Sequence, residues 1–411
     1  MADRDVDFLL IGGGLASANC AACLRRTGAD GSILLVGREP DLPYERPPLS
    51  KGYLRGSEGR AGALVHEAEF YAEQRIEVLT RTSAMKLDLA ARTVKLSDKQ
   101  EVGFGQALLA TGANVRRLNV PGSELEGIHY LRTFANSDAI RSDAAGMRVV
   151  LIGGSYIAAE VAASLTELGS QCTLVMMESV VLSRQFGAEA ARYFHELLNG
   201  HGITVYGDDE LDSFAGADGR VTTVVTKAGR ELAADAVIIG AGVNADVMLA
   251  RGAGLELGES GGIRVDACLQ TATAGVYAAG DAAEYESVIH GRRIRVEHWD
   301  VAFHQGRTAA QNMLGAGADY DVVPYFFSDL SDWAAIEYVG PARQWDQEVI
   351  RGSMDEGAFT VFYLDQGRLA GALTVGRSED LQLARRLIAS GEPVGDRSVQ
   401  LADLSIDIDT L

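Results

Sequence analysis

Two stretches of the chain share one pattern of apolar and polar positions. In the first, the apolar run DFLLI (7–11) leads into glycines and then into the helix-like stretch ANCAACLRR. In the second, RVVLI (148–152) leads into a Gly-Gly turn and the helix-like stretch AAEVAASLTELG. A further apolar run follows each of them, SILLVG and CTLVMM. A strand, a glycine turn, a helix and a second strand form the βαβ unit of nucleotide-binding domains. The repeated pattern therefore predicts two Rossmann-like dinucleotide-binding domains in an α/β fold.

The other hydrophobic patterns predict how these domains are arranged along the chain. Short alternating runs after each βαβ unit indicate antiparallel strands, and GVYAAGDAAEY indicates one more buried strand that ends in Gly-Asp. Near the end, FTVFYL and LAGALTV are typical of an antiparallel sheet, and DLQLARRLIASG of a closing helix. We expect a first dinucleotide-binding domain at 1–114 and 243–323, a second one inserted at 115–242, and a C-terminal α+β domain at 324–411.

Charge and composition exclude several classes of function. The formal net charge of −20 argues against nucleic acid as a partner, because phosphate binding needs clustered Lys and Arg. No apolar run reaches the roughly eighteen residues of a membrane span, and the first residues lack the apolar core of a signal peptide. We therefore expect a cytoplasmic protein without a membrane partner. The seven histidines lack the spacing of metal ligands, so no metal site is expected.

The first glycine turn has the residue types that a dinucleotide pyrophosphate requires. Gly12 permits a tight turn after the strand, and Gly14 lets the backbone approach the phosphates. The helix that begins there offers free N–H groups and the positive end of its dipole. Ser17, a small residue, replaces the third glycine of the usual motif. Arg38 stands where an acid for the adenosine ribose is expected, so the adjacent Glu39 is the candidate ribose ligand.

The second glycine turn, at Gly153 and Gly154, departs further from the motif. Ser155 places a side chain where a dinucleotide would lie close, although its hydroxyl also offers a donor for phosphate. Glu178, after the next strand, is the candidate for the ribose hydroxyls of NADH. No Lys or Arg stands immediately at this strand end to accept a 2′-phosphate, so NADH is favoured over NADPH. The alternative is a domain that keeps the fold and binds a nicotinamide nucleotide poorly.

Several segments, taken together, carry a specific family resemblance. They are PYERPPLSKGYL (43–54), LLATGA (108–113), YLRT (130–133), GGSYIAAEVA (153–162), VYAAGD (276–281), VEHWDVAFHQGRTAAQNML (296–314) and PYFFSD (324–329). They resemble the single-FAD ferredoxin reductases of cytochrome P450 and Rieske oxygenase systems, such as the putidaredoxin, rubredoxin and biphenyl-dioxygenase ferredoxin reductases. Apoptosis-inducing factor and monodehydroascorbate reductase are similar in the same regions. The resemblance covers nearly the whole chain and implies a glutathione-reductase-like fold, with FAD in the first domain and NADH in the second.

The resemblance also implies a catalytic pair at the flavin. Lys51 and Glu160 match a lysine–glutamate pair near flavin N5, where the ammonium would stabilise negative charge on reduced flavin and the carboxylate would make the buried cation tolerable. Asp281 matches an acid that accepts a ribityl hydroxyl, and Trp299 lines the pyrimidine side of the flavin. The expected cofactor-binding residues are Gly12, Gly14, Ala16, Arg38, Glu39, Arg46, Lys51, Ala84, Thr111, Gly112, Arg132, Gly280, Asp281, Glu297, His298, Trp299, Gly153, Gly154, Ser155, Ile157, Glu160, Glu178 and Gly242. Arg38 stands where relatives carry an acid for the flavin ribose, and Ala158 and Met176 depart from the family's pattern in the second domain. These three changes bear on dinucleotide affinity and on the choice between NADH and NADPH more than on the reaction.

The implied activity is that of an FAD-dependent NADH:ferredoxin reductase, in class EC 1.18.1. Hydride passes from NADH to flavin N5, and single electrons then pass to a [2Fe–2S] ferredoxin that feeds a cytochrome P450 or a Rieske oxygenase. Arg307 matches a family position implicated in ferredoxin docking, and Arg292, Arg293 and Arg295 are close to the flavin-lining segment in sequence. We expect these four arginines to form the docking site; the alternative is a solvated, arginine-bearing hairpin.

The cysteines argue against a disulfide reductase. Cys20 and Cys23 form a C-x-x-C, but they lie in the helix after the first glycine turn, where they face one side as small packing groups. The segment expected at the flavin, PYERPPLSKGYL, has no cysteine. Three other functions stay open: an apoptosis-inducing-factor-like or NADH-oxidase-like redox sensor, a monodehydroascorbate-type reductase, and a flavin-binding interaction protein without turnover.

Overall fold

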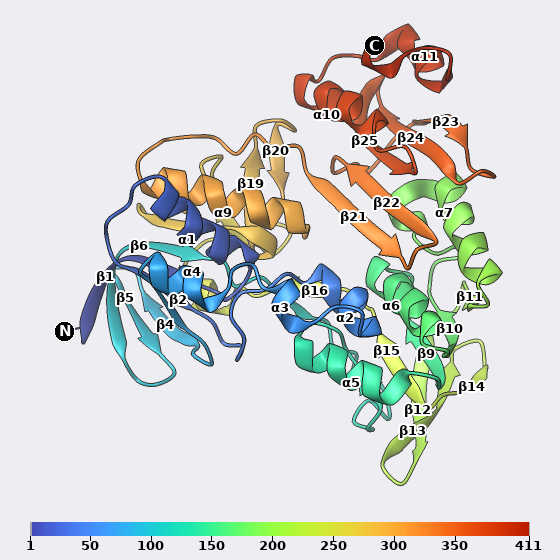
Figure 1. Ribbon diagram of the computed structural model, residues 1–411, viewed down its shortest axis with the longest axis horizontal. Helices are drawn as coiled ribbons and strands as arrows, with labels where there is room; N and C mark the ends of the chain where they lie inside the picture. Colours follow the sequence, from blue (N-terminus) through green and yellow to red (C-terminus); the bar gives the residue numbers. More distant parts are fainter. Residues whose placement is uncertain (1, 411) are drawn as a thin grey trace. The chain divides into compact units, whose positions relative to one another are not determined.

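The computed structural model describes residues 2–410, and the chain divides into two compact units (Figure 1). Unit 1 comprises Met1–Glu45, Ala61–Asn114 and Asn244–Tyr325. Unit 2 comprises Arg46–Arg60, Val115–Val243 and Phe326–Leu411. Two parallel sheets and a C-terminal antiparallel sheet confirm the predicted fold class. The domain limits given above stay predictions.

A mostly parallel sheet forms the centre of unit 1. Its strands are β1 (Arg4–Ile11), β2 (Ile33–Val36), β3 (Ile76–Leu79), β4 (Ala84–Asp88), β5 (Thr93–Leu96), β6 (Glu101–Leu109) and β18 (Val276–Ala278). The order is β3-β2-β1-β6-β5-β4, and β18 also pairs with β6. Strand β1 has Leu9 opposite Leu34 on one side and Ala107 on the other. Continuous apolar strands of this kind are typical of a parallel sheet that is buried on both faces.

Two helices cross closely beside this sheet. They are α1 (Leu15–Arg26) and α9 (Trp299–Met313), and they pack directly against each other. The crossing requires glycine at Gly306, because a Cβ there would lie 2.2 Å from the carbonyl oxygen of Ala16. The close contact therefore ties the start of α1 to the flavin-lining segment that the sequence predicts at 296–314.

Smaller elements complete unit 1 and its connections. They are α3 (Arg60–Ala63), α4 (Ala68–Glu73), β7 (Ala113–Val115), β16 (Val243–Ala245), α8 (Met248–Gly252), the 3-10 turn η2 (Gly280–Ala282), and a small sheet of β17 (Ile263–Val265), β19 (Ala283–Ser287) and β20 (Arg292–Ile294). The chain leaves unit 1 twice on its way to these last elements: first after Glu45, returning at Ala61, and then along β7, returning along β16.

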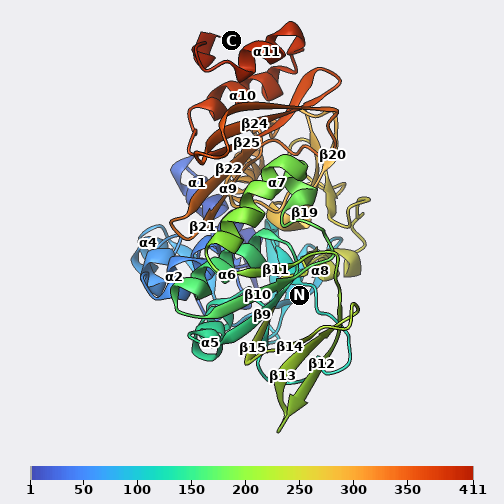
Figure 2. The ribbon, with the colours of Figure 1, turned by 90° about the vertical axis from the view of Figure 1, so that its right-hand side faces the viewer.

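The second parallel sheet lies in unit 2. Its strands are β8 (Ile128–His129), β9 (Arg148–Ile152), β10 (Gln171–Val175), β11 (Thr204–Tyr206) and β15 (Ala236–Ile239), in the order β11-β10-β9-β15-β8. Its helical elements are η1 (Pro47–Ser50), α2 (Gly52–Arg55), α5 (Phe134–Ala144), α6 (Tyr156–Glu167) and α7 (Ser183–Gly200). A three-stranded antiparallel sheet of β12 (Leu211–Ala217), β13 (Arg220–Thr226) and β14 (Glu231–Ala233) projects from the rest of this unit (Figures 1 and 2).

The C-terminal part of unit 2 is an antiparallel sheet with helices beside it. Its elements are β21 (Tyr325–Leu330), β22 (Ala334–Val339), β23 (Gln347–Ser353), β24 (Ala358–Asp365), β25 (Arg368–Val375), α10 (Asp380–Ser390), η3 (Gly395–Arg397), α11 (Ser398–Ala402) and η4 (Ile408–Thr410). One buried side chain ties the last turns to the sheet: Arg351 on β23 donates hydrogen bonds to the carbonyls of Leu401, Asp403 and Ile406 at 3.3, 2.6 and 3.0 Å. Its Nε also lies 3.4 Å from the buried carboxylate of Asp380.

Candidate functional site

The predicted site residues of unit 1 gather at one edge of the parallel sheet. Gly12 follows β1, Arg38 follows β2, Thr111 follows β6, and Gly280 follows β18. These four strands are neighbours and parallel, in the order β2-β1-β6-β18, so their carboxyl ends lie at the same edge. Ligands of open α/β sheets bind at that edge. Positions that are far apart in sequence are thus brought together where a dinucleotide is expected.

The first glycine turn has the geometry of a phosphate cradle. Gly12 has a φ of +124°, and a Cβ there would lie 2.0 Å from the carbonyl oxygen of Ala110, so only glycine fits the turn. Gly14 is the N-cap of α1 with a φ of −107°, and a Cβ built on it meets nothing within 4 Å. No side chain of the described residues caps this helix. The N–H groups in the first turn of α1 therefore have no side-chain cap, and the space beside Gly14 lets an anion approach this helix end.

Two buried polar atoms at the α1–α9 crossing support the presence of a bound group. Ser17 Oγ and Gln305 Nε2 are both fully buried, and neither has a hydrogen-bond partner among the described residues. Buried polar groups nearly always have a partner in folded proteins. The residues present thus fit a dinucleotide such as FAD, together with ordered water. Gln305 was not predicted from the sequence, because a buried glutamine in a helix carries no motif.

Gln305 also shapes the Gly-Asp turn after β18. Its Oε1 accepts the N–H of Gly280 at 2.8 Å, and Arg295 donates to the carbonyl of Asp281 at 3.1 Å. Arg295 forms an ion pair with Glu297 as well. The turn that carries Asp281, the predicted ribityl ligand, is therefore held from two sides by side chains of unit 1.

The segment before and at the start of α9 is aromatic. His298 is the N-cap of the helix, and Trp299 is its first residue. The indole of Trp299 stacks on Phe303 with ring centroids 5.4 Å apart. Burial lowers the pKa of His298 to about 4, so its imidazole is neutral near pH 7. A neutral imidazole can both donate and accept a hydrogen bond, which suits the polar edge expected of a flavin ring.

Arg38 and Glu39 are both engaged by neighbours within unit 1. The guanidinium of Arg38 lies 3.0 Å from Asp246 Oδ2 and 2.5 Å from Asn114 Oδ1. Glu39 accepts a hydrogen bond from the hydroxyl of Tyr44 at 2.5 Å. The positive charge of Arg38 is therefore neutralised by Asp246, an acid that the sequence pattern did not identify. The ribose contact of Glu39 stays a prediction.

Four other expected residues, Ala16, Ala84, Thr111 and Gly112, also lie in unit 1. Thr111 donates to the carbonyl of Asp246 at 2.6 Å, and the N–H of Asp246 donates to the carbonyl of Gly112 at 2.8 Å. Ala84 is the first residue of β4, and Ala16 lies in the first turn of α1.

Unit 2 brings the predicted lysine–glutamate pair together. Lys51 lies between η1 and α2, and Glu160 lies on α6. Lys51 Nζ is 3.5 Å from Glu160 Oε1 and 3.1 Å from Asp329 Oδ2. The hydroxyls of Ser50 and Ser328 each lie 2.5 Å from one of the two carboxylate oxygens of Glu160. The lysine–glutamate pair that the resemblance implied is thus part of a cluster that also contains Ser50, Ser328 and Asp329.

Glu160 and Lys51 are both buried, with side chains 6% and 10% exposed. Burial raises the pKa of Glu160, an effect that Lys51 and the two serine hydroxyls partly offset. Asp329 is 42% exposed on the side-chain scale, so water remains in contact with it. The sequence alone could not identify Asp329, because only the fold brings residues 51 and 329 together.

Arg46 and Arg132, also in unit 2, contact each other through the backbone. The guanidinium of Arg46 donates to the carbonyl of Arg132. The N–H of Arg132 donates to Asn136 Oδ1 at 3.2 Å, beside the capping box that begins α5.

The second glycine turn differs from the first in its hydrogen bonds. Gly153 and Gly154 connect β9 to α6, and Ser155 is the N-cap. Ser155 Oγ accepts the N–H of Ala158 at 3.4 Å and donates to the carbonyl of Gly240 at 3.0 Å. One N–H group in the first turn of α6, that of Ala158, is thus already hydrogen-bonded within the protein. The Ser155 hydroxyl is engaged locally, which reduces what it can offer a phosphate.

The acid after β10 has an arginine partner. Glu178 Oε1 is 2.6 Å from Arg184 Nε, and the guanidinium of Arg184 is largely exposed. The sequence showed no basic residue directly at this strand end; the fold supplies one from α7. Ile157, in the first turn of α6, is 41% exposed, and the carbonyl of Gly242 accepts the N–H of Arg116.

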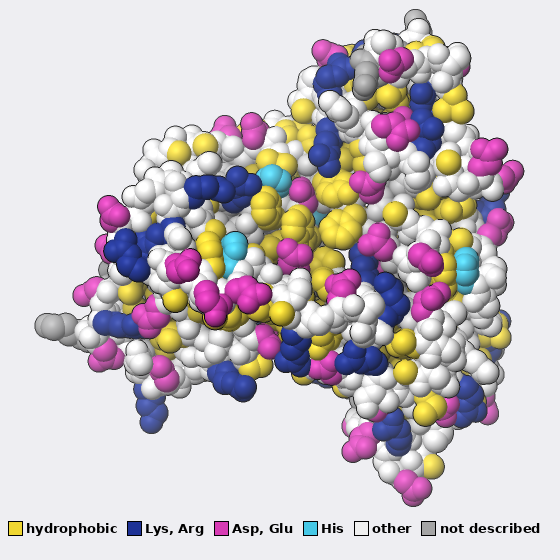
Figure 3. All heavy atoms as spheres, in the orientation of Figure 1, with side chains coloured by type: hydrophobic (Ala, Val, Ile, Leu, Met, Phe, Trp, Pro, Cys, Tyr) yellow, Lys and Arg dark blue, Asp and Glu magenta, His cyan; other side chains and the backbone are white. Residues whose placement is uncertain are grey.

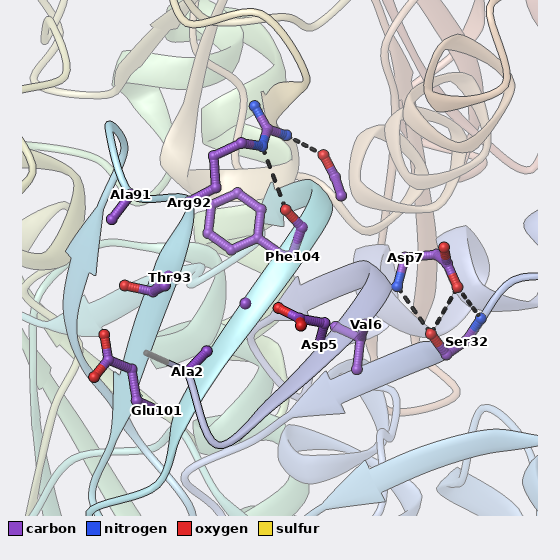
Figure 4. A pocket seen from close by; sticks show the side chains of 12 residues that line it. Ala2, Asp5, Val6, Asp7, Ser32, Ala91, Arg92, Thr93, Glu101 and Phe104 are labelled. Carbon is purple, nitrogen blue, oxygen red and sulfur yellow. Dashed lines mark hydrogen bonds between the residues drawn. The ribbon is translucent and has the colours of Figure 1, made fainter.

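A hollow of about 600 Å³ lies at the opposite edge of the sheet in unit 1 (Figure 4). It is lined by the amino-terminal halves of β1 and β6, with Asp5, Asp7, Arg92 and Glu101 among its residues. Asp7 accepts hydrogen bonds from Ser32, and Arg92 donates to backbone carbonyls, so these two side chains already have partners within the protein. None of the residues that line it is one of the predicted site residues.

Comparison with protein families identifies the family to which the chain belongs. Residues 6–306 match the pyridine nucleotide-disulphide oxidoreductase model, which is more than half of the chain, and residues 325–411 match the reductase C-terminal model. The chain belongs to the pyridine nucleotide-disulphide oxidoreductase family. Family membership confirms the expected flavin and nicotinamide cofactors and the assignment as an oxidoreductase. The preference for NADH stays a prediction.

Individual relatives of this pyridine nucleotide-disulphide oxidoreductase match over almost their whole length. The ferredoxin–NAD(+) reductase component of the anthranilate 1,2-dioxygenase system of Burkholderia cepacia is 35% identical over 405 residues, with 98% of each chain covered. The ferredoxin reductase for the CYP199A2 system from Rhodopseudomonas palustris has a TM-score of 0.93 at 34% identity, covering 99% of both chains. A putidaredoxin reductase, solved in a covalent complex with putidaredoxin, has a TM-score of 0.93 at 30% identity, covering 100% of this chain and 98% of that one. The predicted resemblance to ferredoxin reductases is thus confirmed.

The four cysteines, all among the described residues, are free thiols. Cys20 and Cys23 are buried in α1, where Cys20 contacts Met313 and Cys23 contacts the backbone of Arg307. Burial raises the pKa of the Cys20 thiol. A buried thiol with a raised pKa is a poor nucleophile, which fits the packing role predicted for Cys20, and the burial of Cys23 in the same helix fits that role too.

Within residues 2–410, no three acidic, histidine or cysteine side chains are arranged to hold a metal ion. None of the helices in that range combines the length and the apolar character needed to cross a membrane.

Proposed function

We propose that this protein is an FAD-dependent NADH:ferredoxin reductase. The observation that carries the proposal is the full-length similarity to a putidaredoxin reductase that was solved as a covalent complex with putidaredoxin. The first glycine turn supports it, because its open face at Gly14 and its uncapped helix fit a dinucleotide. By the same reasoning the acceptor is a [2Fe–2S] ferredoxin that serves a cytochrome P450 or a Rieske oxygenase.

Each unit, taken by itself, supplies side chains that would serve this reaction. When bound, FAD accepts hydride from NADH and passes electrons on singly, which links a two-electron donor to a one-electron acceptor. The N–H groups at the start of α1 would hold the pyrophosphate, and Asp281 a ribityl hydroxyl. Lys51 supplies a buried positive charge that favours added negative charge beside it. His298, neutral near pH 7, supplies a polar ring without a competing charge.

NADH is the proposed electron donor. Glu178 would accept the adenosine ribose hydroxyls, and a carboxylate at that place repels a 2′-phosphate. Arg184 neutralises part of that charge from 2.6 Å away, so we expect discrimination by a modest factor rather than complete exclusion of NADPH. The ratio of kcat/KM for the two nucleotides measures it.

The proposed docking site for ferredoxin centres on Arg307. Its guanidinium lies over the ring of Phe303, 5.2 Å from the centroid. Arg293 and Arg295 already pair with Glu286 and Glu297, so less of their charge is available to a partner. On the face shown in Figure 3, basic side chains stand in small groups among acidic ones. With a net charge of −20, the protein would attract an acidic ferredoxin only through such a local group, in which we also place Arg292.

Steady-state kinetics test the function. NADH oxidation is followed with a panel of [2Fe–2S] ferredoxins and with cytochrome c as the final acceptor, and NADPH is run in parallel. Ferredoxin-dependent reduction of cytochrome c supports the proposal. Turnover with monodehydroascorbate alone would assign a small-molecule acceptor instead. If neither NADH nor NADPH reduces the FAD-loaded protein, the protein is not a reductase.

Charge reversal tests the docking site. Arg307→Glu should raise the KM for ferredoxin about tenfold, since close interfacial charge pairs are worth about 1.5 kcal/mol or more, and should leave NADH-dependent reduction of ferricyanide unchanged. Arg251→Glu, which reverses an exposed arginine on α8, is the control and should alter neither rate. Equal effects of the two variants would remove Arg307 from the docking site. The cytoplasmic location also remains a prediction, which cell fractionation tests.

A further inference from the structure

The buried ammonium of Lys51 has two acidic neighbours, and they are not equivalent. Asp329 Oδ2 lies 3.1 Å from Lys51 Nζ, whereas the nearest oxygen of Glu160 lies 3.5 Å away. Lys51 Nζ also lies 4.7 Å from the centroid of the Phe327 ring, two residues before Asp329. The segment 327–329 of β21 therefore holds the ammonium both through a ring face and through the nearer carboxylate.

The surroundings of Glu160 suit a neutral carboxyl group as well as a charged one. Ser50 Oγ is 2.5 Å from Glu160 Oε2 and 3.3 Å from the carbonyl of Pro47. A protonated Glu160 can donate to Ser50, and Ser50 then donates to Pro47, while Ser328 keeps donating to the other oxygen. No donor or acceptor is lost in that arrangement. The buried position of Glu160 favours it, because a buried charge costs more than a buried carboxyl group.

We propose that Asp329 is the counter-ion and positioning residue of Lys51, and that Glu160 is a protonatable partner held by Ser50 and Ser328. Asp329 is partly exposed, so its charge is hydrated and costs less to maintain than a charge on Glu160. The closer and better solvated carboxylate carries the negative charge opposite the ammonium.

This assignment has a consequence for the proposed reaction, and it rests on the proposed function. Hydride transfer carries two electrons and one proton from NADH, which leaves as NAD⁺, so the receiving side gains one negative charge. A carboxylate that neutralises Lys51 weakens the stabilisation of that added charge. Asp329 would thereby hold the midpoint potential of the bound flavin at a lower value.

Potentiometric titration of the FAD-loaded protein tests the assignment without relying on turnover. Asp329→Asn should make the midpoint potential more positive by the equivalent of about a tenfold change in the two-electron equilibrium, about 30 mV. Asp332→Asn, which removes the same charge from an exposed position three residues further along, is the matched control and should leave the potential unchanged. Measured on the acid side of the pKa of Glu160, Glu160→Gln should also change it little, because there it replaces a neutral group by another neutral group.

The pH dependence adds a readout that a merely structural role would not alter. Without Asp329, Lys51 has only Glu160 to neutralise it, so the pKa of Glu160 should fall, and the break in the plot of potential against pH should move to lower pH. If Asp329→Asn and Asp332→Asn leave the same potential, the proposal is wrong. A shift with Glu160→Gln that equals or exceeds the one with Asp329→Asn makes Glu160 the counter-ion and also overturns it.

The wild-type protein separates this test from that of the function. A wild type that binds FAD and is reduced by NADH, with no effect of Asp329→Asn, refutes only the counter-ion assignment. A wild type that binds no FAD refutes the proposed function. If Asp329→Asn does not fold, the Glu160→Gln titration still decides, because the proposal requires it to leave the potential nearly unchanged.

Discussion

Two neighbouring glycines of the first turn should respond to alanine in opposite ways. At Gly12 the added methyl group would lie 2.0 Å from the carbonyl oxygen of Ala110 at a φ of +124°. Backbone strain and overpacking each cost about 1–3 kcal/mol, so Gly12→Ala should destabilise the protein by about 2–6 kcal/mol. At Gly14 the methyl group meets nothing, and φ is −107°, so Gly14→Ala should cost the fold at most about 1 kcal/mol as a changed N-cap.

Gly14→Ala, which leaves the fold stable, should instead weaken the binding of FAD. The methyl group of Gly14→Ala would stand in front of the free N–H groups of α1 and push the pyrophosphate away from them. One lost hydrogen bond to a charged group is worth about 1.5–3 kcal/mol, which corresponds to a roughly 10- to 150-fold higher Kd for FAD. Gly62→Ala is the control, because a Cβ on Gly62 also meets nothing within 4 Å and the residue lies in α3, outside the glycine turn.

Urea unfolding of the apoprotein and quenching of FAD fluorescence separate the two effects. The expected pattern is a large loss of stability for Gly12→Ala alone and a weakened affinity for FAD in a stable Gly14→Ala. Wild-type affinity in Gly14→Ala would show that the pyrophosphate does not approach the turn at that point. A loss of stability in Gly14→Ala as large as in Gly12→Ala would refute the steric reasoning itself.

Three further predictions concern unit 2. Arg351→Met should lower the free energy of unfolding by about 1–3 kcal/mol, because it removes the donor of three carbonyls, that of Leu401 buried, and one of the two arginines beside the buried Asp380, which keeps Arg377 and Thr360. The exposed control Arg386→Met should stay within about 0.5 kcal/mol; urea titration measures both. Because burial raises the pKa of Glu160 above its ordinary value of 4.5, the stability that this group contributes is complete below that value and is lost as the pH rises through the folded-state pKa. Glu160→Gln should therefore match the wild type at about pH 4 and gain relative stability by about pH 8; a constant difference between the two pH values would contradict this. Ser155→Gly frees the N–H of Ala158, so the KM for NADH should fall about three- to tenfold at a cost of a few tenths of a kcal/mol in helix capping, and an unchanged or higher KM would exclude that N–H as a phosphate ligand.

The sequence predicts the two nucleotide-binding folds well because their signal is local. The apolar runs at 7–11 and 148–152 lie in β1 and β9, and the glycines after them form the two turns that lead into α1 and α6. The antiparallel end of the chain is predictable for the same reason, since FTVFYL and LAGALTV lie within β24 and β25. Each of these patterns is complete within a few residues, so no knowledge of distant contacts is needed.

The parts that the sequence did not reveal depend on contacts between distant residues. Asp329 is an ordinary acid in its own segment and becomes a partner of Lys51 only when β21 lies beside η1 and α2. Gln305 and Asp246 are likewise unremarkable in sequence, yet one shapes the Gly-Asp turn and the other neutralises Arg38. Ser155 shows the intermediate case: its place in the motif is visible, but its bond to the carbonyl of Gly240 is not. Spacing along the chain identifies candidate residues, and packing decides which groups are already satisfied.

The interleaving of the two units sets an order for folding during translation. Unit 1 has all its segments once Tyr325 has been synthesised, whereas unit 2 begins at Arg46 and still lacks its last stretch at that moment. Until residues 328 and 329 leave the ribosome, Lys51 lacks its nearer acid and Glu160 lacks one of its two serine partners. A nascent chain of which only residues 1–325 have left the ribosome would therefore hold a complete first unit and an incomplete second one, in which Lys51 and Glu160 still lack their partners at residues 328 and 329. Such contacts between distant residues slow folding, and holdase chaperones have their longest opportunity to bind in that interval.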